Sequence, residues 1–117
     1  MKRDRAYYLD TYIAGRLYAD ADKAWPSLRI GTPVRLVREP DNPKDPEAIA
    51  VYVNIEEQLL KLGYLPYRRT SPIALFLDMG WEAAFGATIS RLDPSATYDR
   101  QIGIIIRILR NNLDGER

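Results

Sequence analysis

The segment Glu39–Pro46 (EPDNPKDP) carries three prolines in eight residues, so it can be neither a helix nor a regular strand. The segments on its two sides, Thr32–Arg38 and Ala48–Asn54, are rich in apolar β-branched residues and have the pattern of strands. The sequence therefore predicts two strands joined by a rigid, irregular loop, within a fold that is mainly β.

Similar strand patterns occur elsewhere in the chain. In chain order we expect further strands over Thr11–Tyr18, Lys61–Tyr64, Glu82–Leu92 and Tyr98–Arg110. The first of them contains Gly15, which indicates a bulge, a bend or the close approach of another backbone. The last contains three successive isoleucines, 104–106, which we expect to be buried on both faces. Ile55–Leu60 is expected to form a turn, as the tip of a hairpin.

Helical signals are fewer. Ser71 as N-cap, Pro72 at the first position and Gly80 at the end delimit one predicted helix. Its apolar face, with i, i+3, i+4 spacing, consists of Ile73, Phe76 and Leu77. Residues 19–28 are expected to form a loop or a short helical turn. Five or six strands with one or two short helices predict a small, partly closed β-barrel with a helix over one opening, and an α+β sandwich is the alternative.

The composition bounds the chemistry. The 117 residues, 46% of them hydrophobic, suffice for one domain over residues 1–117, with its core at residues 11–110 and frayed ends such as 111–117. Cysteine and histidine are both absent. Because these residues supply most thiol nucleophiles, general bases and transition-metal ligands, we predict a protein that is not an enzyme and needs no metal or cofactor.

The charge balance points away from bulk electrostatic binding. Seventeen basic side chains oppose 16 acidic ones, for a net charge of +1, so any recognition of a polyanion must be local and geometric. The charged first residues do not resemble a signal peptide, and no apolar run approaches the roughly 18 residues of a membrane span. We therefore expect a cytoplasmic protein without a membrane partner.

Two interpretations of the proline-rich loop remain open. Asn42 and Asp45 can cap the amides of the loop itself, as in a rigid structural turn, or can also keep an outward lone pair for a ligand. A calcium or magnesium site is disfavoured, since the spacing lacks the central glycine and the alternation of a calcium loop. The carboxylates considered for it are Glu39, Asp41, Asp45 and Glu47.

The run REPDNPKDPEAIAVYV, followed by LGYLPYRRTSPIALFLDMG, resembles the HIRAN domain family. The family pattern is a glycine-bearing first strand, an R-x-P-x-N-P-x-D-x-x-A-I-x-V segment and a G-[YH]-[LI]-[PK] segment before a helix. The matching residues are Gly15, Arg38, Pro40, Asn42, Pro43, Asp45, Ala48, Ile49, Val51, Gly63, Tyr64, Leu65 and Pro66. The resemblance covers residues 11–110 and implies an OB-like β-barrel that binds the 3′ end of single-stranded DNA.

The resemblance also implies roles for particular residues. Asp45 matches the carboxylate that accepts a hydrogen bond from the free 3′-hydroxyl, and Asn42 matches the amide that fixes the terminal nucleotide. Tyr18 and Tyr98 match aromatic residues on which bases stack. These are the residues expected to distinguish a strand end from an internal phosphodiester.

A second group is expected to contact phosphates. Tyr64, Tyr67, Arg68 and Arg69 surround the position where the family has a basic residue, and the two arginines are the best phosphate contacts. Lys44 replaces a family aromatic, so it is expected either to contact a phosphate or to pair with its neighbouring aspartate.

We accordingly predict a non-catalytic module that binds single-stranded DNA or DNA 3′ ends in repair or at replication forks, with a helicase or nuclease as a further partner. The alternative is a protein-interaction domain that kept the scaffold and lost DNA-end recognition, which Lys44 and Glu47 favour. Other arginines are expected on solvated strand faces, with Arg38 bracing the loop through Asp41 or Asp45. The remaining arginines in that group are Arg29, Arg35, Arg100, Arg107 and Arg110.

Overall fold

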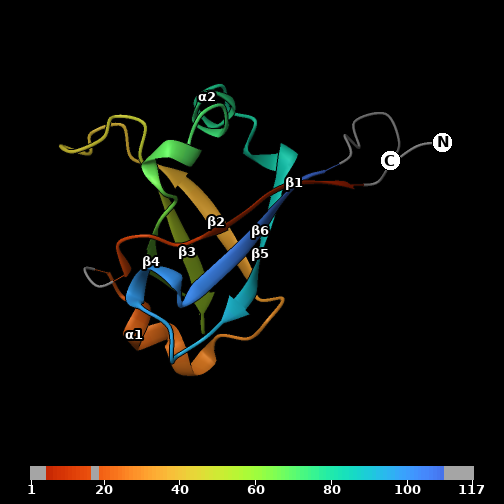
Figure 1. The fold of residues 1–117 in the computed structure, drawn as a ribbon. Helices are drawn as coiled ribbons and strands as arrows, with labels where there is room; N and C mark the ends of the chain where they lie inside the picture. The colour runs from red at the N-terminus through yellow and green to blue at the C-terminus, as the bar shows by residue number, and fades with distance from the viewer. Residues whose placement is uncertain (1–4, 17–18, 110–117) are drawn as a thin grey trace.

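Six antiparallel strands form one sheet with the order β1-β6-β5-β2-β3-β4 (Figure 1). The computed structural model describes residues 5–16 and 19–109. The strands are β1 (Arg5–Tyr12), β2 (Pro33–Arg38), β3 (Ile49–Ile55), β4 (Gln58–Tyr64), β5 (Phe85–Leu92) and β6 (Ile102–Leu109). The mainly β, OB-like fold predicted from the sequence is confirmed.

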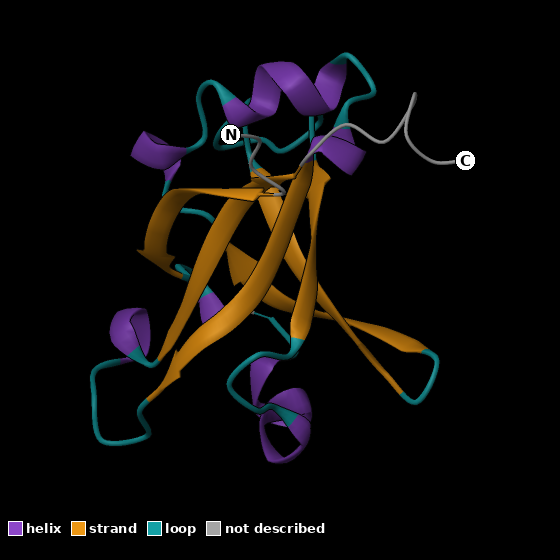
Figure 2. Ribbon diagram, turned by 90° about the vertical axis from the view of Figure 1, so that its right-hand side faces the viewer, coloured by secondary structure: helices purple, strands orange, loops and turns teal. Residues whose placement is uncertain are grey.

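The sheet curls until its two edges meet at a single point. Just beyond the end of β1, Ala14 forms a bridge to Tyr64 at the end of β4, with two backbone hydrogen bonds of 2.8 Å. Gly15 follows immediately with a φ of +70°, so it forms the bend that the sequence indicated. No ladder of hydrogen bonds joins β1 to β4 among the described residues, and the barrel is only partly closed. Helical turns cover both of its ends (Figure 2).

The core lies inside the curl of the sheet. Ile104 and Ile106 of β6 are fully buried, whereas Ile105 between them is only half-buried on the outer face. The expectation that this block is buried on both faces is therefore wrong for the middle residue, because only one face of the sheet packs on the core. The other fully buried large aliphatic side chains are Ile13, Ile49, Leu62, Ile73, Ile89, Ile102, Val51 and Val53.

The first strand lies earlier than predicted. It is Arg5–Tyr12 rather than Thr11–Tyr18, and it pairs with β6 from Arg5↔Leu109 to Tyr12↔Gly103. β1 is an edge strand, where an outward charge such as that of Asp10 is tolerated.

The β3–β4 hairpin is tighter than predicted. Its turn consists of Glu56 and Glu57, with φ of +51° and +68°, rather than all of Ile55–Leu60. Two positive φ values match the twist of a two-residue hairpin, but the turn lacks the glycine or asparagine that usually signals it. For this reason β4 begins three residues before the predicted Lys61.

The helical segments are short. They are α1 (Ala21–Ala24), η2 (Trp25–Ser27), η3 (Tyr67–Arg69), α2 (Ile73–Asp78), η4 (Glu82–Ala84) and η5 (Tyr98–Arg100). The helical turn predicted for residues 19–28 is confirmed. Two predicted strands, 82–92 and 98–110, each begin with a 3₁₀ turn instead, η4 and η5. No helix among the described residues is long and apolar enough to cross a membrane.

Helix α2 is shorter than expected and begins differently. Pro72 occupies the N-cap, and no side chain caps the helix, so the prediction that Ser71 is the N-cap is wrong. The backbone carbonyl of Thr70 instead accepts the N–H of Ala74 at 2.8 Å. On the predicted apolar face Ile73 is fully buried, but Phe76 is 36% exposed because it packs against Trp81 at the surface.

Candidate nucleic-acid interface

The loop between β2 and β3 is held by its own short polar side chains. Oδ1 of Asn42 accepts the backbone N–H groups of Lys44 at 2.9 Å and Asp45 at 3.1 Å. Oδ1 of Asp45 accepts the N–H of Glu47 at 2.9 Å. Oδ2 of Asp45 accepts no hydrogen bond within the described part of the chain. The structural interpretation therefore holds for Asn42, while Asp45 caps the loop and still has one free acceptor.

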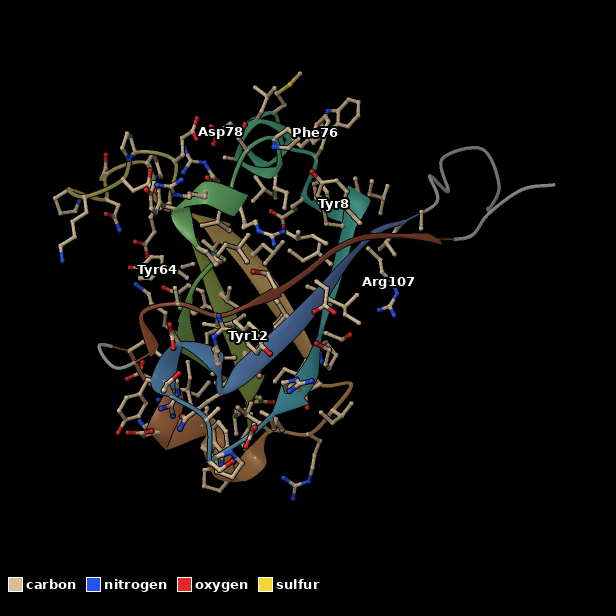
Figure 3. The ribbon with its side chains drawn as sticks, viewed as in Figure 1. Tyr8, Tyr12, Tyr64, Phe76, Asp78 and Arg107 are labelled. Atoms are coloured by element: carbon tan, nitrogen blue, oxygen red, sulfur yellow. The ribbon has the colours of Figure 1, made fainter. Side chains whose placement is uncertain are left out.

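Arg38 braces the same loop. Its guanidinium donates to the carbonyls of Ala48 at 2.8 Å and Pro46 at 2.9 Å. It also donates to both carboxylate oxygens of Asp78 at 2.7 and 3.2 Å. Asp78 lies on α2 (Figure 3). The side chain of Arg38 is only 13% exposed. The expectation of a solvated arginine that pairs with Asp41 or Asp45 is wrong, because loop carbonyls and an aspartate 40 residues away satisfy it.

A hydrogen-bonded cluster of four residues connects the loop to β4. Oε2 of Glu39 lies 2.7 Å from Nζ of Lys61. Oε1 of Glu39 accepts from the Tyr64 hydroxyl at 2.8 Å and from Nδ2 of Asn42 at 3.2 Å. Lys61 also donates to the Tyr64 hydroxyl at 3.0 Å. Two of the sequence-predicted site residues, Asn42 and Tyr64, are thus joined through the Glu39 carboxylate.

The cluster shifts the pKa values of both charged members. Burial raises the pKa of Glu39, but hydrogen bonds from Lys61, Tyr64 and Asn42 outweigh it and leave this pKa below its usual value. The hydrogen bond to Glu39 is the main reason why the pKa of Lys61 is raised. Because hydrogen bonds occupy both of its oxygens, Glu39 is a poor ligand for a metal cation. No group of three or more acidic, histidine or cysteine side chains in the described residues is arranged to hold a metal ion.

Tyr98 lies in η5 against a buried arginine. The Arg16 side chain is 4% exposed and donates to Asp22 at 2.6 Å. Its guanidinium carbon lies 5.1 Å from the ring centre of Tyr98 and 5.3 Å from that of Trp25. Tyr98 is itself 51% exposed, so one part of its ring is held by a cation and another faces solvent. Arg16 was not among the residues predicted for the site, and its position beside Gly15 is its one distinctive feature in the sequence.

The remaining predicted site residues take no part in the contact between Arg16 and Tyr98. Tyr67 is exposed, and its hydroxyl accepts from Nε of Arg68 at 2.9 Å. Arg69 lines a separate hollow on the outer face of the sheet. Lys44 is exposed and forms no ion pair with Asp45 within the described residues. Tyr18 lies outside the described residues.

A series of contacts connects four of the predicted residues to one another. Asp45 and Asn42 share the loop, and Asn42 meets Tyr64 through Glu39. The ring of Tyr64 lies beside Gly15, and the next residue, Arg16, contacts Tyr98. We call Asn42, Asp45, Tyr64 and Tyr98 the site row. It has a carboxylate acceptor at one end and an aromatic ring at the other. A carboxylate accepts hydrogen bonds from hydroxyl groups, and an aromatic ring offers a face on which a base can stack.

Comparison with known proteins places the chain among HIRAN domains. Residues 6–107 match the family model of the HIRAN domain. The chain is 27% identical to a Fanconi-associated nuclease 1 homolog of Arabidopsis thaliana over 96% of its length, and 36% identical to one of Oryza sativa subsp. japonica over 69%. It spans only 12% and 8% of the lengths of these relatives.

Two solved structures share the fold. A protein from Lactobacillus plantarum has a TM-score of 0.73 and 26% sequence identity, with 92% of this chain and 97% of the other covered. The HIRAN domain of human HLTF has a TM-score of 0.59, with 92% and 79% covered. At 16% identity the second likeness supports the fold alone.

Proposed function

This chain belongs to the HIRAN domain family, and we propose that it is a non-catalytic module that binds single-stranded DNA at its 3′ end through the site row. We further propose that it acts in DNA repair or at replication forks beside a nuclease or helicase. Two relatives are Fanconi-associated nuclease 1 homologs, of which it spans 12% and 8%, so a nuclease is the partner that the comparisons favour.

The observation that carries the proposal is the free oxygen of Asp45. One oxygen of this carboxylate accepts the N–H of Glu47, and Oδ2 accepts no hydrogen bond in the described chain. Asn42 holds the middle of the surrounding loop, and Arg38 holds its end. A fixed carboxylate with an open acceptor suits a hydroxyl, which can donate a hydrogen bond, and repels a phosphate, which is an anion.

The other members of the row would orient the terminal nucleotide. The half-exposed ring of Tyr98 offers a face on which a base can stack, and the cation of Arg16 on the same ring adds to its rigidity. Lys44 leaves Asp45 open and is free to contact a phosphate.

The test is fluorescence anisotropy with a labelled oligonucleotide that ends in either a 3′-hydroxyl or a 3′-phosphate. The proposal expects tighter binding of the hydroxyl end, and expects Asp45→Asn to remove that preference, because the hydroxyl end loses its charged acceptor while the phosphate end is no longer repelled. Asp41→Asn is the matched control in the same loop. Equal binding of both ends by the unmodified protein would contradict the proposal.

A second candidate function is protein binding, which the surface around α2 favours. Its large apolar side chains are well exposed: Leu75 by 59%, Met79 by 61% and Trp81 by 56%. Clusters of this kind mark interaction sites on monomeric proteins. Failure to bind any oligonucleotide would favour this alternative, in which the scaffold is kept and DNA-end recognition is lost.

A further inference from the structure

A hollow of about 600 Å³ on the outer face of β1, β6 and β5 gathers three arginines. Arg91 comes from β5, Arg100 from η5 and Arg69 from η3, so three separate segments converge on it. Gly103 of β6 lies between Tyr12 of β1 and Arg91 of β5 in the pairing. A Cβ at Gly103 would lie 3.1 Å from Cβ of Arg91, so glycine at this position lets Arg91 lie close over β6.

The charge of this arginine hollow contrasts with that of the chain. Three basic side chains and one acidic side chain, Asp10, line it, whereas the whole protein has a net charge of only +1. None of its arginines forms an ion pair with a described carboxylate. The three guanidinium groups are therefore available to an anion, and their planar forks suit phosphate oxygens.

The hollow and the site row each take one residue from η5. Tyr98 of this turn contacts Arg16, and Arg100, two residues later, lies 5.6 Å over the ring of Tyr12 inside the hollow. A single DNA strand whose 3′-terminal nucleotide binds the site row would leave the row past Tyr98. Its upstream phosphates would then lie beside the arginines of the hollow.

We propose that the arginine hollow is a phosphate-binding track for the strand that leads away from the bound end. This inference rests on the proposed function and extends it. The row recognises the terminal nucleotide, and Arg69, Arg91 and Arg100 contact the phosphodiesters upstream without regard to base sequence. Affinity then depends on strand length, although recognition of the end does not.

The test compares two single strands, a trinucleotide and one of about 12 nucleotides, each with either a 3′-hydroxyl or a 3′-phosphate end. Binding is measured by anisotropy from about 50 to about 200 mM salt. The variant is Arg91→Gln with Arg100→Gln, which leaves the site row intact. The matched control is Arg29→Gln with Arg35→Gln, two exposed arginines that do not line the hollow.

If the hollow is a phosphate-binding track, the Arg91→Gln/Arg100→Gln variant should bind the trinucleotide as tightly as the unmodified protein does. It should bind the longer strand more weakly. Each phosphate contact with a single strand contributes about 0.7 to the slope of log affinity against log salt, so two lost contacts should lower its magnitude by about 1.4. Between the two salt concentrations the variant should then lose about sevenfold less affinity than the unmodified protein.

Other outcomes separate the two proposals. If the trinucleotide binds with 3′-hydroxyl preference while the variant and the control bind the longer strand equally well, the track is wrong and the proposed function stands. If the longer strand weakens in the variant but neither strand shows end preference, the track is supported and end recognition is wrong. If neither oligonucleotide binds, both proposals are wrong.

Discussion

Glu39 and Lys61 form an ion pair of 2.7 Å that joins the loop after β2 to β4, a strand that is not a neighbour of β2 in the sheet. Glu39 follows β2 and Lys61 lies in β4, with β3 between them. Only about a quarter of either side chain is exposed, at 22% and 26%. The pair therefore links the start of the loop to the strand that carries Tyr64, and it anchors the centre of the site row.

The first prediction concerns the pH dependence of this pair. The pKa of Glu39 lies below its ordinary 4.5, so its stabilising contribution is present above pH 4.5 and is lost as the pH falls through the lowered pKa. Glu39→Gln should cost about 1–2 kcal/mol of unfolding free energy at neutral pH, because the hydrogen bonds to a charge are lost. At about pH 3 the difference from the unmodified protein should shrink.

Urea denaturation at both pH values measures this effect. Glu82→Gln serves as the control, since Glu82 is 67% exposed and lies 3.7 Å from its arginine partner. An equal loss in Glu39→Gln at acidic and neutral pH would show that the pair acts through packing alone. Above pH 10.5 the raised pKa of Lys61 predicts a second loss of stability in the unmodified protein.

A second prediction addresses Arg38. Arg38→Lys keeps the charge but cannot reach the two carbonyls and both oxygens of Asp78 together. We expect a loss of about 2 kcal/mol in stability and faster hydrogen exchange at the loop amides of Lys44 and Asp45. Arg35→Lys, at an exposed position, should change neither quantity. Unchanged exchange in the loop would mean that Arg38 does not brace it.

A third prediction compares a substitution that causes a steric clash, at Gly63, with one that causes only backbone strain, at Gly31. A Cβ at Gly63 would overlap the carbonyl oxygen of Ala14 and lie 2.6 Å from Cγ2 of Ile13, where the two sheet edges meet. Gly63→Ala should therefore cost at least about 3 kcal/mol. At Gly31 the φ is +93° and a Cβ would meet nothing within 4 Å, so Gly31→Ala should cost only about 1 kcal/mol. Equal losses in thermal or urea unfolding would contradict this account.

The fourth prediction distinguishes the roles of Tyr98 and Arg16, which contact each other at the end of the site row. Tyr98→Ala should weaken binding of single-stranded DNA by about 1–3 kcal/mol, the value of one stacked base, with little loss of stability because the ring is 51% exposed. Arg16→Ala should reduce both affinity and stability, since it removes a buried side chain that bonds Asp22. Anisotropy and urea denaturation give the two quantities. If Tyr98→Ala lowers stability as much as Arg16→Ala does, Tyr98 is a structural residue.

Part of the candidate site was predictable from the sequence. The three prolines of Glu39–Pro46 required an irregular loop, and the short side chains of Asn42 and Asp45 suited caps within it. The partners of the loop were not predictable. Arg38 meets Asp78 across 40 residues, and no periodicity in one sequence encodes which strands and helices a curled sheet brings together.

Local sequence patterns determined the β character of the chain, the place of its loop, the absence of thiol and imidazole chemistry, and the family resemblance. These properties depend on residue types and short spacings, which can be read directly from the sequence. The tertiary structure alone decided that β1 starts at Arg5, that Glu39 pairs with Lys61, and that three arginines share one hollow. Each of these depends on strand register and on the curvature of the sheet, which arise from packing over the whole core.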